Sequence, residues 1–183
     1  MTCIVGIKTD DAVHIGSDSA GVSGGLVEIR RDSKVFSLGE FIFGFTSSFR
    51  MGQLIQYRFT PPTPPQEAEQ VFAYMATDFV DAVRKVFEEY GYMGKDDTGR
   101  EEGGTFMVGY KNRLFEVHSD FQVAEFVMNF ASVGCGSPYA LGSLYWSGHL
   151  MPKERIYMAL EAAEFFSAGV RGPFKCVSTG GKA

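Results

Sequence analysis

Short strand-like segments joined by very short turns open this chain, and they constrain its fold more than any other feature. The first two segments are separated by Thr9-Asp10-Asp11, and a later pair by Gly39-Glu40. Such connections join antiparallel strands, because parallel strands need a crossover of a dozen or more residues. The pattern therefore predicts an antiparallel meander and not a series of βαβ units. The predicted strands cover residues 2–8, 12–18, 26–30, 35–38 and 41–45.

Two pairs of helices follow, separated by further strands. A first helix should end at the proline run 61–65, because proline cannot continue a helix. Residues 66–90 carry apolar side chains at helical spacing and predict the longest helix, and 91–104 reads as a charged loop. This order predicts an α+β domain. The other predicted helices are one over 47–59, one that follows an N-cap at Ser137 and one that begins at Pro152. The other predicted strands cover 105–110, 114–118, 124–133 and 174–179.

Composition limits the classes of protein to which the chain can belong. Its 183 residues suit one domain with a sizeable core. A formal charge of −5 and a pI near 5.2 argue against a nucleic-acid partner. No signal peptide or membrane-length apolar run is present. The three cysteines are widely spaced and odd in number, which suits a reducing compartment, so we expect a cytoplasmic protein.

The second residue offers the most compact catalytic unit in the chain. If Met1 is removed, Thr2 carries a hydroxyl nucleophile and an α-amine that can act as its base. An α-amine titrates near ~7.7–8.0, so much of it can accept a proton at neutral pH. The alternative is that a small second residue merely permits removal of the initiator methionine.

Several short blocks together resemble a known family. They are Thr2-Cys3-Ile4-Val5-Gly6-Ile7, Gly16-Ser17-Asp18, Asp32-Ser33-Lys34-Val35, Phe43-Gly44-Phe45-Thr46-Ser47-Ser48 and Gly134-Cys135-Gly136-Ser137-Pro138. In order and spacing they are similar to proteasome β-type subunits and HslV-like peptidases, which are N-terminal-nucleophile threonine hydrolases. The resemblance implies one domain over 1–183 with a four-layer αββα sandwich, in which two antiparallel sheets are flanked by helices.

The resemblance also implies roles for individual residues. Lys34 would lie beside the Thr2 oxygen, and Asp18 would hold the Lys34 ammonium, because a buried lysine needs a carboxylate nearby. Gly44 would donate its backbone N–H to the oxyanion. Each has a plainer interpretation: Asp18 as a turn aspartate, Lys34 as a surface lysine, and Gly44 as a strand bulge.

Two departures from the family pattern concern the same site. Cys135 stands where the family has a serine near the nucleophile's amine, and a thiol is a weak hydrogen-bond partner. Ser137 could compensate, or Cys135 could simply occupy a tight turn. The stretch Phe165-Phe166-Ser167-Ala168-Gly169 lacks the aspartate that the family often carries. No cofactor is expected to be required, but Cys176 and Thr179 match the spacing of a sodium-binding strand.

The sequence thus predicts a cytoplasmic threonine endopeptidase that forms an acyl-enzyme on Thr2. By resemblance it would assemble as a homo-oligomeric ring and receive unfolded polypeptides from an ATPase unfoldase of the AAA+ class. That ATPase must be a separate protein, because the chain has no nucleotide-binding loop. Two alternatives remain open: a catalytically inactive structural or binding protein with the same fold, and a small-molecule amidase.

Overall fold

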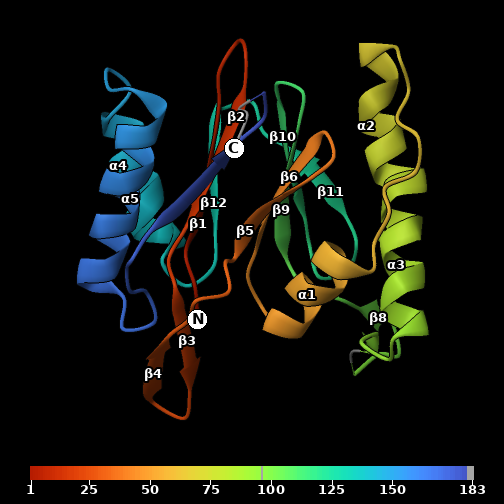
Figure 1. Ribbon diagram of the computed structural model, residues 1–183, viewed down its shortest axis with the longest axis horizontal. Helices are drawn as coiled ribbons and strands as arrows, with labels where there is room; N and C mark the ends of the chain where they lie inside the picture. Colours follow the sequence, from red (N-terminus) through yellow and green to blue (C-terminus); the bar gives the residue numbers. More distant parts are fainter. Residues whose placement is uncertain (96, 181–183) are drawn as a thin grey trace.

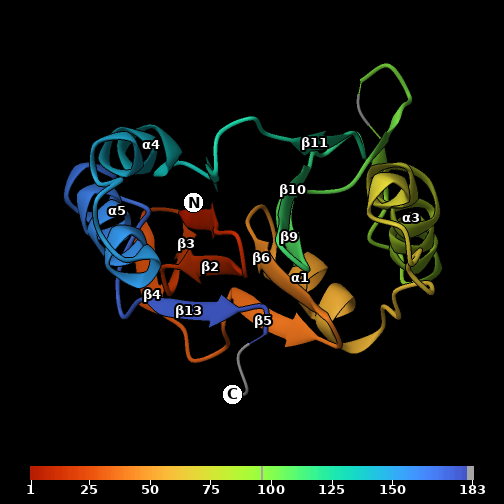
Figure 2. The same ribbon diagram turned by 90° about the horizontal axis from the view of Figure 1, so that it is seen from above.

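The computed structural model describes residues 1–95 and 97–180, and its elements form four layers (Figures 1 and 2). Helices α4 (Ser137–Trp146) and α5 (Pro152–Phe166) cover one outer face, and the helices between residues 49 and 89 cover the other. Two antiparallel sheets stack between these helical layers. The predicted α+β fold with an αββα order of layers is confirmed.

The first sheet has the strand order β12-β1-β2-β13. The predicted tight turn joins its two central strands, with the Thr9 N–H donating to the Ala12 carbonyl at 2.8 Å. Ile4 of β1 lies opposite Val133 of β12. The turn that follows β12 therefore lies beside the N-terminus. The strands are β1 (Ile4–Lys8), β2 (Val13–Ser17), β12 (Phe130–Val133) and β13 (Lys175–Ser178).

The second sheet has the strand order β11-β10-β9-β6-β5, and each neighbouring pair is antiparallel. Its β5–β6 hairpin turns at Gly39, whose φ of 60° lies in the left-handed region that glycine adopts readily. The hairpin predicted around Gly39-Glu40 is confirmed. The strands are β5 (Val35–Leu38), β6 (Phe41–Phe45), β9 (Phe106–Tyr110), β10 (Arg113–Val117) and β11 (Val123–Glu125).

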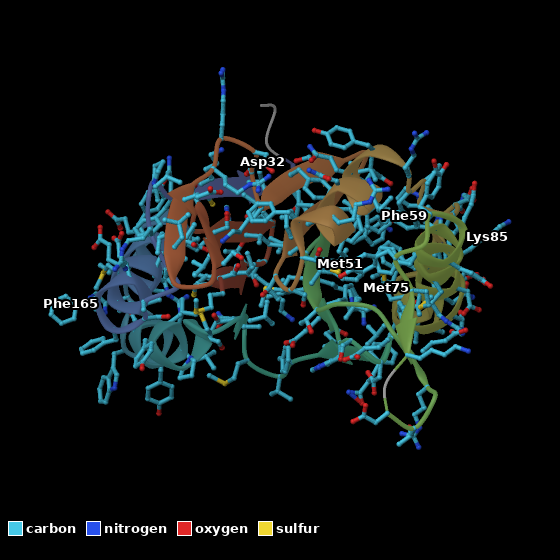
Figure 3. All side chains as sticks on the ribbon, turned by 90° about the horizontal axis from the view of Figure 1, so that it is seen from below. Asp32, Met51, Phe59, Met75, Lys85 and Phe165 are labelled. Atoms are coloured by element: carbon cyan, nitrogen blue, oxygen red, sulfur yellow. The ribbon has the colours of Figure 1, made fainter. Side chains whose placement is uncertain are left out.

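Three hydrophobic cores join the four layers. The core between the second sheet and its helices is rich in aromatic residues, and Met51, Phe59 and Met75 lie in it (Figure 3). The core under α4 and α5 and the core between the sheets are largely aliphatic. The sheets pack closely at Gly44, where an added Cβ would come within 2.6 Å of Ile4. Such close packing leaves little freedom for one sheet to shift against the other.

The predicted long helix forms, but its middle is wound differently. Residues 68–89 run without interruption through a 3-10 turn, a short α-helix, a π-helical turn and a second α-helix. In the widened part the Thr77 hydroxyl donates to the Ala73 carbonyl at 2.7 Å, which competes with the regular backbone pattern. None of the helices among the described residues is long and apolar enough to span a bilayer. The segments are η1 (Ala68–Gln70), α2 (Val71–Tyr74), η2 (Met75–Phe79) and α3 (Val80–Glu89).

A separate hairpin projects from the end of the two sheets near the N-terminus (Figure 1). It pairs β3 (Ala20–Ser23) with β4 (Leu26–Ile29), and Gly24 and Gly25 both have positive φ in its two-residue turn. Strand β4 is exposed along its whole length. Only Gly24 and Gly25 form the turn, because β3 pairs as far as Ser23 with Leu26.

Three other predictions need correction. The strand expected over residues 124–133 is divided between β11 and β12, which belong to different sheets. The loop expected over 91–104 contains a two-stranded ribbon of β7 (Gly94–Lys95) and β8 (Glu101–Glu102), although Asp96 lies outside the described residues. Gly136, and not Ser137, precedes α4 as the N-cap.

Candidate active site

Thr2 lies two residues before the start of β1 and is held against the turn that follows β12. Its carbonyl accepts a hydrogen bond from Gly136 N–H at 3.2 Å. At Gly134, with φ of 99°, an added Cβ would lie 2.3 Å from the same carbonyl oxygen. Only glycine allows the backbones to approach this closely. Thr2 is 5% exposed, and its hydroxyl donates to the Met1 carbonyl at 2.5 Å.

The Asp18 carboxylate follows β2 and is surrounded by donors. One oxygen accepts from Lys34 Nζ at 2.7 Å and from Cys3 N–H at 3.1 Å. The other accepts from Ala20 N–H at 2.9 Å and from Arg171 N–H at 3.4 Å. The carboxylate therefore holds the start of β1 and the Lys34 ammonium together, and its contact with Lys34 is the one that the resemblance implies.

Lys34 precedes β5 and is among the most buried side chains of the chain, with 1% of its surface exposed. Burial lowers the pKa of Lys34, and the charge and hydrogen bond of Asp18 act in the opposite direction. Asp18 extends from the first sheet and Lys34 leads into the second, so their ion pair joins the two sheets. The interpretation of Lys34 as a surface lysine is wrong.

Thr2 and Lys34 both line a pocket of about 230 Å³. The β3–β4 hairpin contributes Gly21, Val22 and Leu26 to the lining. The segment that enters helix α1 (Phe49–Tyr57) contributes residues 45–49. The Arg30 guanidinium lies 3.9 Å from the centre of the Phe49 ring and pairs with Asp32. The hairpin and the start of α1 therefore meet at Arg30 and Phe49, both of which line the pocket.

Gly44 does not lie at this pocket. It is the fourth residue of β6, opposite Val35 on one side and Met107 on the other, in the interior of the second sheet. The missing side chain leaves room for Ile4 and Ile15 of the first sheet. The sequence-based choice of Gly44 as the oxyanion donor is therefore not supported, since this glycine serves sheet packing.

Ser47 is a better-placed backbone donor. It lines the pocket beside Thr2 and has a φ of 61°, which turns the chain from β6 towards α1. The neighbouring N–H groups of Thr46 and Ser48 donate to Thr105 and Thr46 carbonyls. The Ser47 N–H has no acceptor among residues 1–95 and 97–180. An unpaired N–H that lines the same pocket as Thr2, near the positive end of a helix, can stabilise a negative charge.

Among the described residues, Cys135 is the one whose side chain contacts the Thr2 nitrogen. Its Sγ accepts from the Thr2 N–H at 3.3 Å and lies 3.4 Å from the Ser167 hydroxyl. Ser137 does not compensate for the thiol, because its hydroxyl donates to the Ser132 carbonyl at 2.7 Å. Ser167 lies in the stretch that lacks the family's aspartate, and its own contact with Cys135 was not predicted.

The two residues proposed for sodium are engaged elsewhere. The Thr179 hydroxyl accepts from Val13 N–H and donates to the Lys111 carbonyl, both at 2.8 Å. Burial raises the pKa of the Cys176 thiol, and a neutral thiol is a poor ligand for a hard cation. These side chains do not fit a sodium site, and ligation by backbone carbonyls stays a prediction.

Sequence reasoning missed Ser47, Ser167 and the hairpin wall for different reasons. Backbone donors such as the Ser47 N–H leave no side-chain signal. Ser167 reaches Cys135 from the far end of α5, across a separation in sequence that no local pattern reports. The strand over 26–30 was predicted, but no local pattern indicates that its hairpin lines the pocket of Thr2.

Comparison with known proteins supports the fold. Neither known protein families nor curated protein sequences give a match. BPH of Thiobacillus denitrificans is similar in structure, with a TM-score of 0.80 and 21% identity over 97% of both chains, and its structure in complex with epoxomicin gives 0.79 and 19%.

Two further solved structures are similar over 97% of this chain. They are eukaryotic HslV from Trypanosoma brucei, with a TM-score of 0.68, 14% identity and 98% of that chain covered, and Anbu (ancestral beta-subunit) from Yersinia bercovieri, with 0.67, 15% and 81%. At these identities the likeness concerns the fold alone. The chain has the proteasome-type N-terminal-nucleophile fold that its motifs predict.

Proposed function

We propose that this chain, with its proteasome-type fold, is a threonine peptidase that uses Thr2 as its nucleophile once Met1 has been removed. The observation that carries the proposal is the arrangement around Thr2. Thr2 and the buried Lys34 line one pocket, and Asp18 binds both the Lys34 ammonium and the backbone at the start of β1. Removal of Met1 would convert the Thr2 N–H beside Cys135 into a free amine.

In the proposed reaction the Thr2 hydroxyl attacks a peptide carbonyl carbon and passes its proton to its own α-amine. The C–N bond then breaks, the leaving amine takes up that proton, and an ester on Thr2 remains. Water hydrolyses the ester by the reverse proton movements and restores the hydroxyl. The Lys34 ammonium would stabilise the alkoxide character of the oxygen, and the Ser47 N–H would face the oxyanion.

Lys34 suits this role because its charge is buried but paired. Its buried surroundings have a low dielectric constant. They lower the pKa of Lys34, and they also strengthen the electric field of its ammonium group. Cys135 and Ser167 would orient the free amine, with the thiol in contact with both the Thr2 nitrogen and the serine hydroxyl. Substitution of the family's serine by Cys135 thus keeps a polar contact at the amine.

We further propose that the peptidase acts as a homo-oligomer on unfolded polypeptides supplied by a separate ATPase. Helices α4 and α5 present large aromatic side chains to solvent, and Trp146 and Phe165 are 80% and 82% exposed. Figure 3 shows Phe165 extending away from the outer helix. Such a surface favours burial against another copy. Light scattering of the purified protein would measure its mass, and a monomer would contradict this part of the proposal.

The chemistry can be tested by mass spectrometry. The intact mass first shows whether Met1 is absent, and epoxomicin is then added, because it is seen bound to the BPH of Thiobacillus denitrificans. We expect one adduct on the N-terminal peptide that begins with Thr2, and none in a Thr2→Ala variant. Demethionylated protein that forms no adduct and cleaves no peptide would contradict the proposal and favour an inactive protein of the same fold.

A further inference from the structure

A second cavity of about 480 Å³ adjoins the Thr2 pocket, and the chemistry proposed above does not use it. It lies where the two sheets end, between β9 and β10 on one side and the β12–α4 turn on the other. It shares Thr46 and Ser47 with the Thr2 pocket. Its other polar lining includes Thr105, Ser132 and Ser137. Among the described residues around it, Glu116 is the one charged side chain.

Glu116 reaches this cavity because of the alternation of β10. Leu114 lies in the core between the sheets, and Glu116, two residues further on, lies on the same face of the strand. Its register partners are Met107 and Ala124. At this position the inter-sheet space has opened into the cavity, so a carboxylate takes the place of a core side chain. Glu116 is 8% exposed.

The Glu116 carboxylate lacks the partners that a structural carboxylate has. Asp18, which is 1% exposed, accepts four hydrogen bonds. Within residues 1–95 and 97–180, Glu116 accepts none, and its nearest charged partner is His118 Nε2 at 3.6 Å, beyond hydrogen-bond distance. Burial raises the pKa of Glu116, and His118 opposes the shift. The Glu116 side chain is 11% exposed, so its carboxylate keeps a little contact with solvent. A carboxylate with so little solvent and no hydrogen-bond donor is stabilised when a cation pairs with it.

We propose that this cavity binds a basic side chain of the polypeptide substrate, and that Glu116 pairs with its ammonium or guanidinium group. The inference rests on the proposed peptidase function and adds a substrate preference to it. The basic residue belongs to a substrate position other than the one that occupies the Thr2 pocket, because the two cavities are separate except for Thr46 and Ser47. The hydroxyls around Glu116 supply further acceptors for the N–H groups of lysine or arginine.

A metal ion fits this cavity less well than a basic side chain. Among the described residues there is no group of three or more His, Cys, Asp or Glu side chains that could hold one. One carboxylate among serine and threonine hydroxyls matches a single cation with several N–H donors. The volume lies in the range of roughly 300–1,000 Å³ in which proteins commonly accommodate small ligands.

Binding can be measured without turnover by using the Thr2→Ala variant of the full chain. Fluorescein-labelled peptides of one neutral sequence would carry a single lysine at successive positions, each matched by norleucine and glutamate versions. Fluorescence anisotropy gives the affinities. We expect one position at which lysine binds about tenfold more tightly than norleucine, since a hydrogen bond between charged groups is worth roughly this much. Glutamate at that position should bind more weakly than norleucine.

Two variants identify the carboxylate responsible. Glu116→Gln should abolish the preference for lysine and keep the affinity for the norleucine peptide. Glu40→Gln, which removes a charge from the exposed β5–β6 turn, should keep the preference. Equal binding of lysine and norleucine peptides at every position, a preference that survives Glu116→Gln, or no peptide binding at all would each overturn the inference.

The outcome is distinguishable from failure of the proposed function. An epoxomicin adduct on Thr2 together with equal binding of lysine and norleucine peptides would retain the peptidase and reject the basic cavity. A lysine preference that depends on Glu116, in a protein that forms no adduct, would retain the cavity and reject catalysis.

Discussion

The ion pair between Asp18 and Lys34 allows a quantitative prediction about stability. In an Asp18→Asn variant the Lys34 ammonium stays buried and loses its counter-charge at 2.7 Å. The new amide group would also place an N–H₂ against either Lys34 and Cys3 or the N–H groups of Ala20 and Arg171. Breaking a buried pair in this way costs about 3–5 kcal/mol. That is a large share of the ~5–15 kcal/mol by which proteins are typically stable.

Removing the other partner should cost less. In a Lys34→Met variant the Asp18 carboxylate keeps three backbone N–H donors, at 3.1, 2.9 and 3.4 Å. The pKa of Lys34 is lowered overall, so the cost of desolvating its ammonium exceeds the stabilisation that Asp18 gives it. We therefore expect Asp18→Asn to be the more damaging single change. The double variant should be more stable than the sum of the two losses predicts, by about 0.5–3 kcal/mol.

Urea titration followed by far-UV circular dichroism at one fixed protein concentration would measure these free energies of unfolding. Tryptophan fluorescence is a poor probe, because Trp146 is 80% exposed and its surroundings change little on unfolding. If Asp18→Asn cost less than about 1 kcal/mol, or if the two changes were additive, the ammonium would not depend on Asp18. The account of the site as a coupled buried pair would then be wrong.

Three other predictions concern separate features. Burial raises the pKa of Glu116, so its ionisation destabilises the folded state as pH rises through that pKa; Glu116→Gln should raise the melting temperature at neutral pH, and the gain should disappear in acid. Gly44→Ala should lower the free energy of unfolding by about 1–3 kcal/mol through overpacking, as urea titration would show. Iodoacetamide should label the exposed Cys135 first, because burial raises the pKa of Cys3 to about 12 and also raises that of Cys176; peptide mapping would locate the label. Labelling of Cys135 should block the epoxomicin adduct, whereas Cys135→Ser protein should still form the adduct after the same treatment.

The sequence was most informative where structure depends on neighbours along the chain. Tight turns at Thr9-Asp10-Asp11 and Gly39-Glu40 forced antiparallel pairs, and both hairpins are present. The apolar spacing of residues 66–90 predicted a helix that forms over almost the same range. The π-helical turn inside it was not predicted, because apolar periodicity does not report a single widened turn.

Features that depend on distant contacts were harder to predict. Residues 124–133 have a uniform strand-like composition, yet they belong to two sheets, and only packing against β1 and β10 separates them. Gly44 was assigned to catalysis because glycine permits close approach, which is correct, but the group that approaches it is the other sheet and not a substrate. The positions of Thr2, Asp18 and Lys34 were found through family spacing, and their catalytic roles stay proposals.

The β3–β4 hairpin gives the pocket an unusual kind of wall. A two-stranded ribbon on its own is only marginally stable, and this one belongs to neither of the larger sheets. The pocket side of the ribbon carries Gly21, Val22 and Leu26, whereas Val27 and Ile29 of β4 are exposed and do not line the pocket. A protein surface that settled on β4 from outside would stiffen the ribbon and thereby change the shape presented to a peptide inside. Selectivity at Thr2 would then be set in part by whatever neighbour the hairpin acquires.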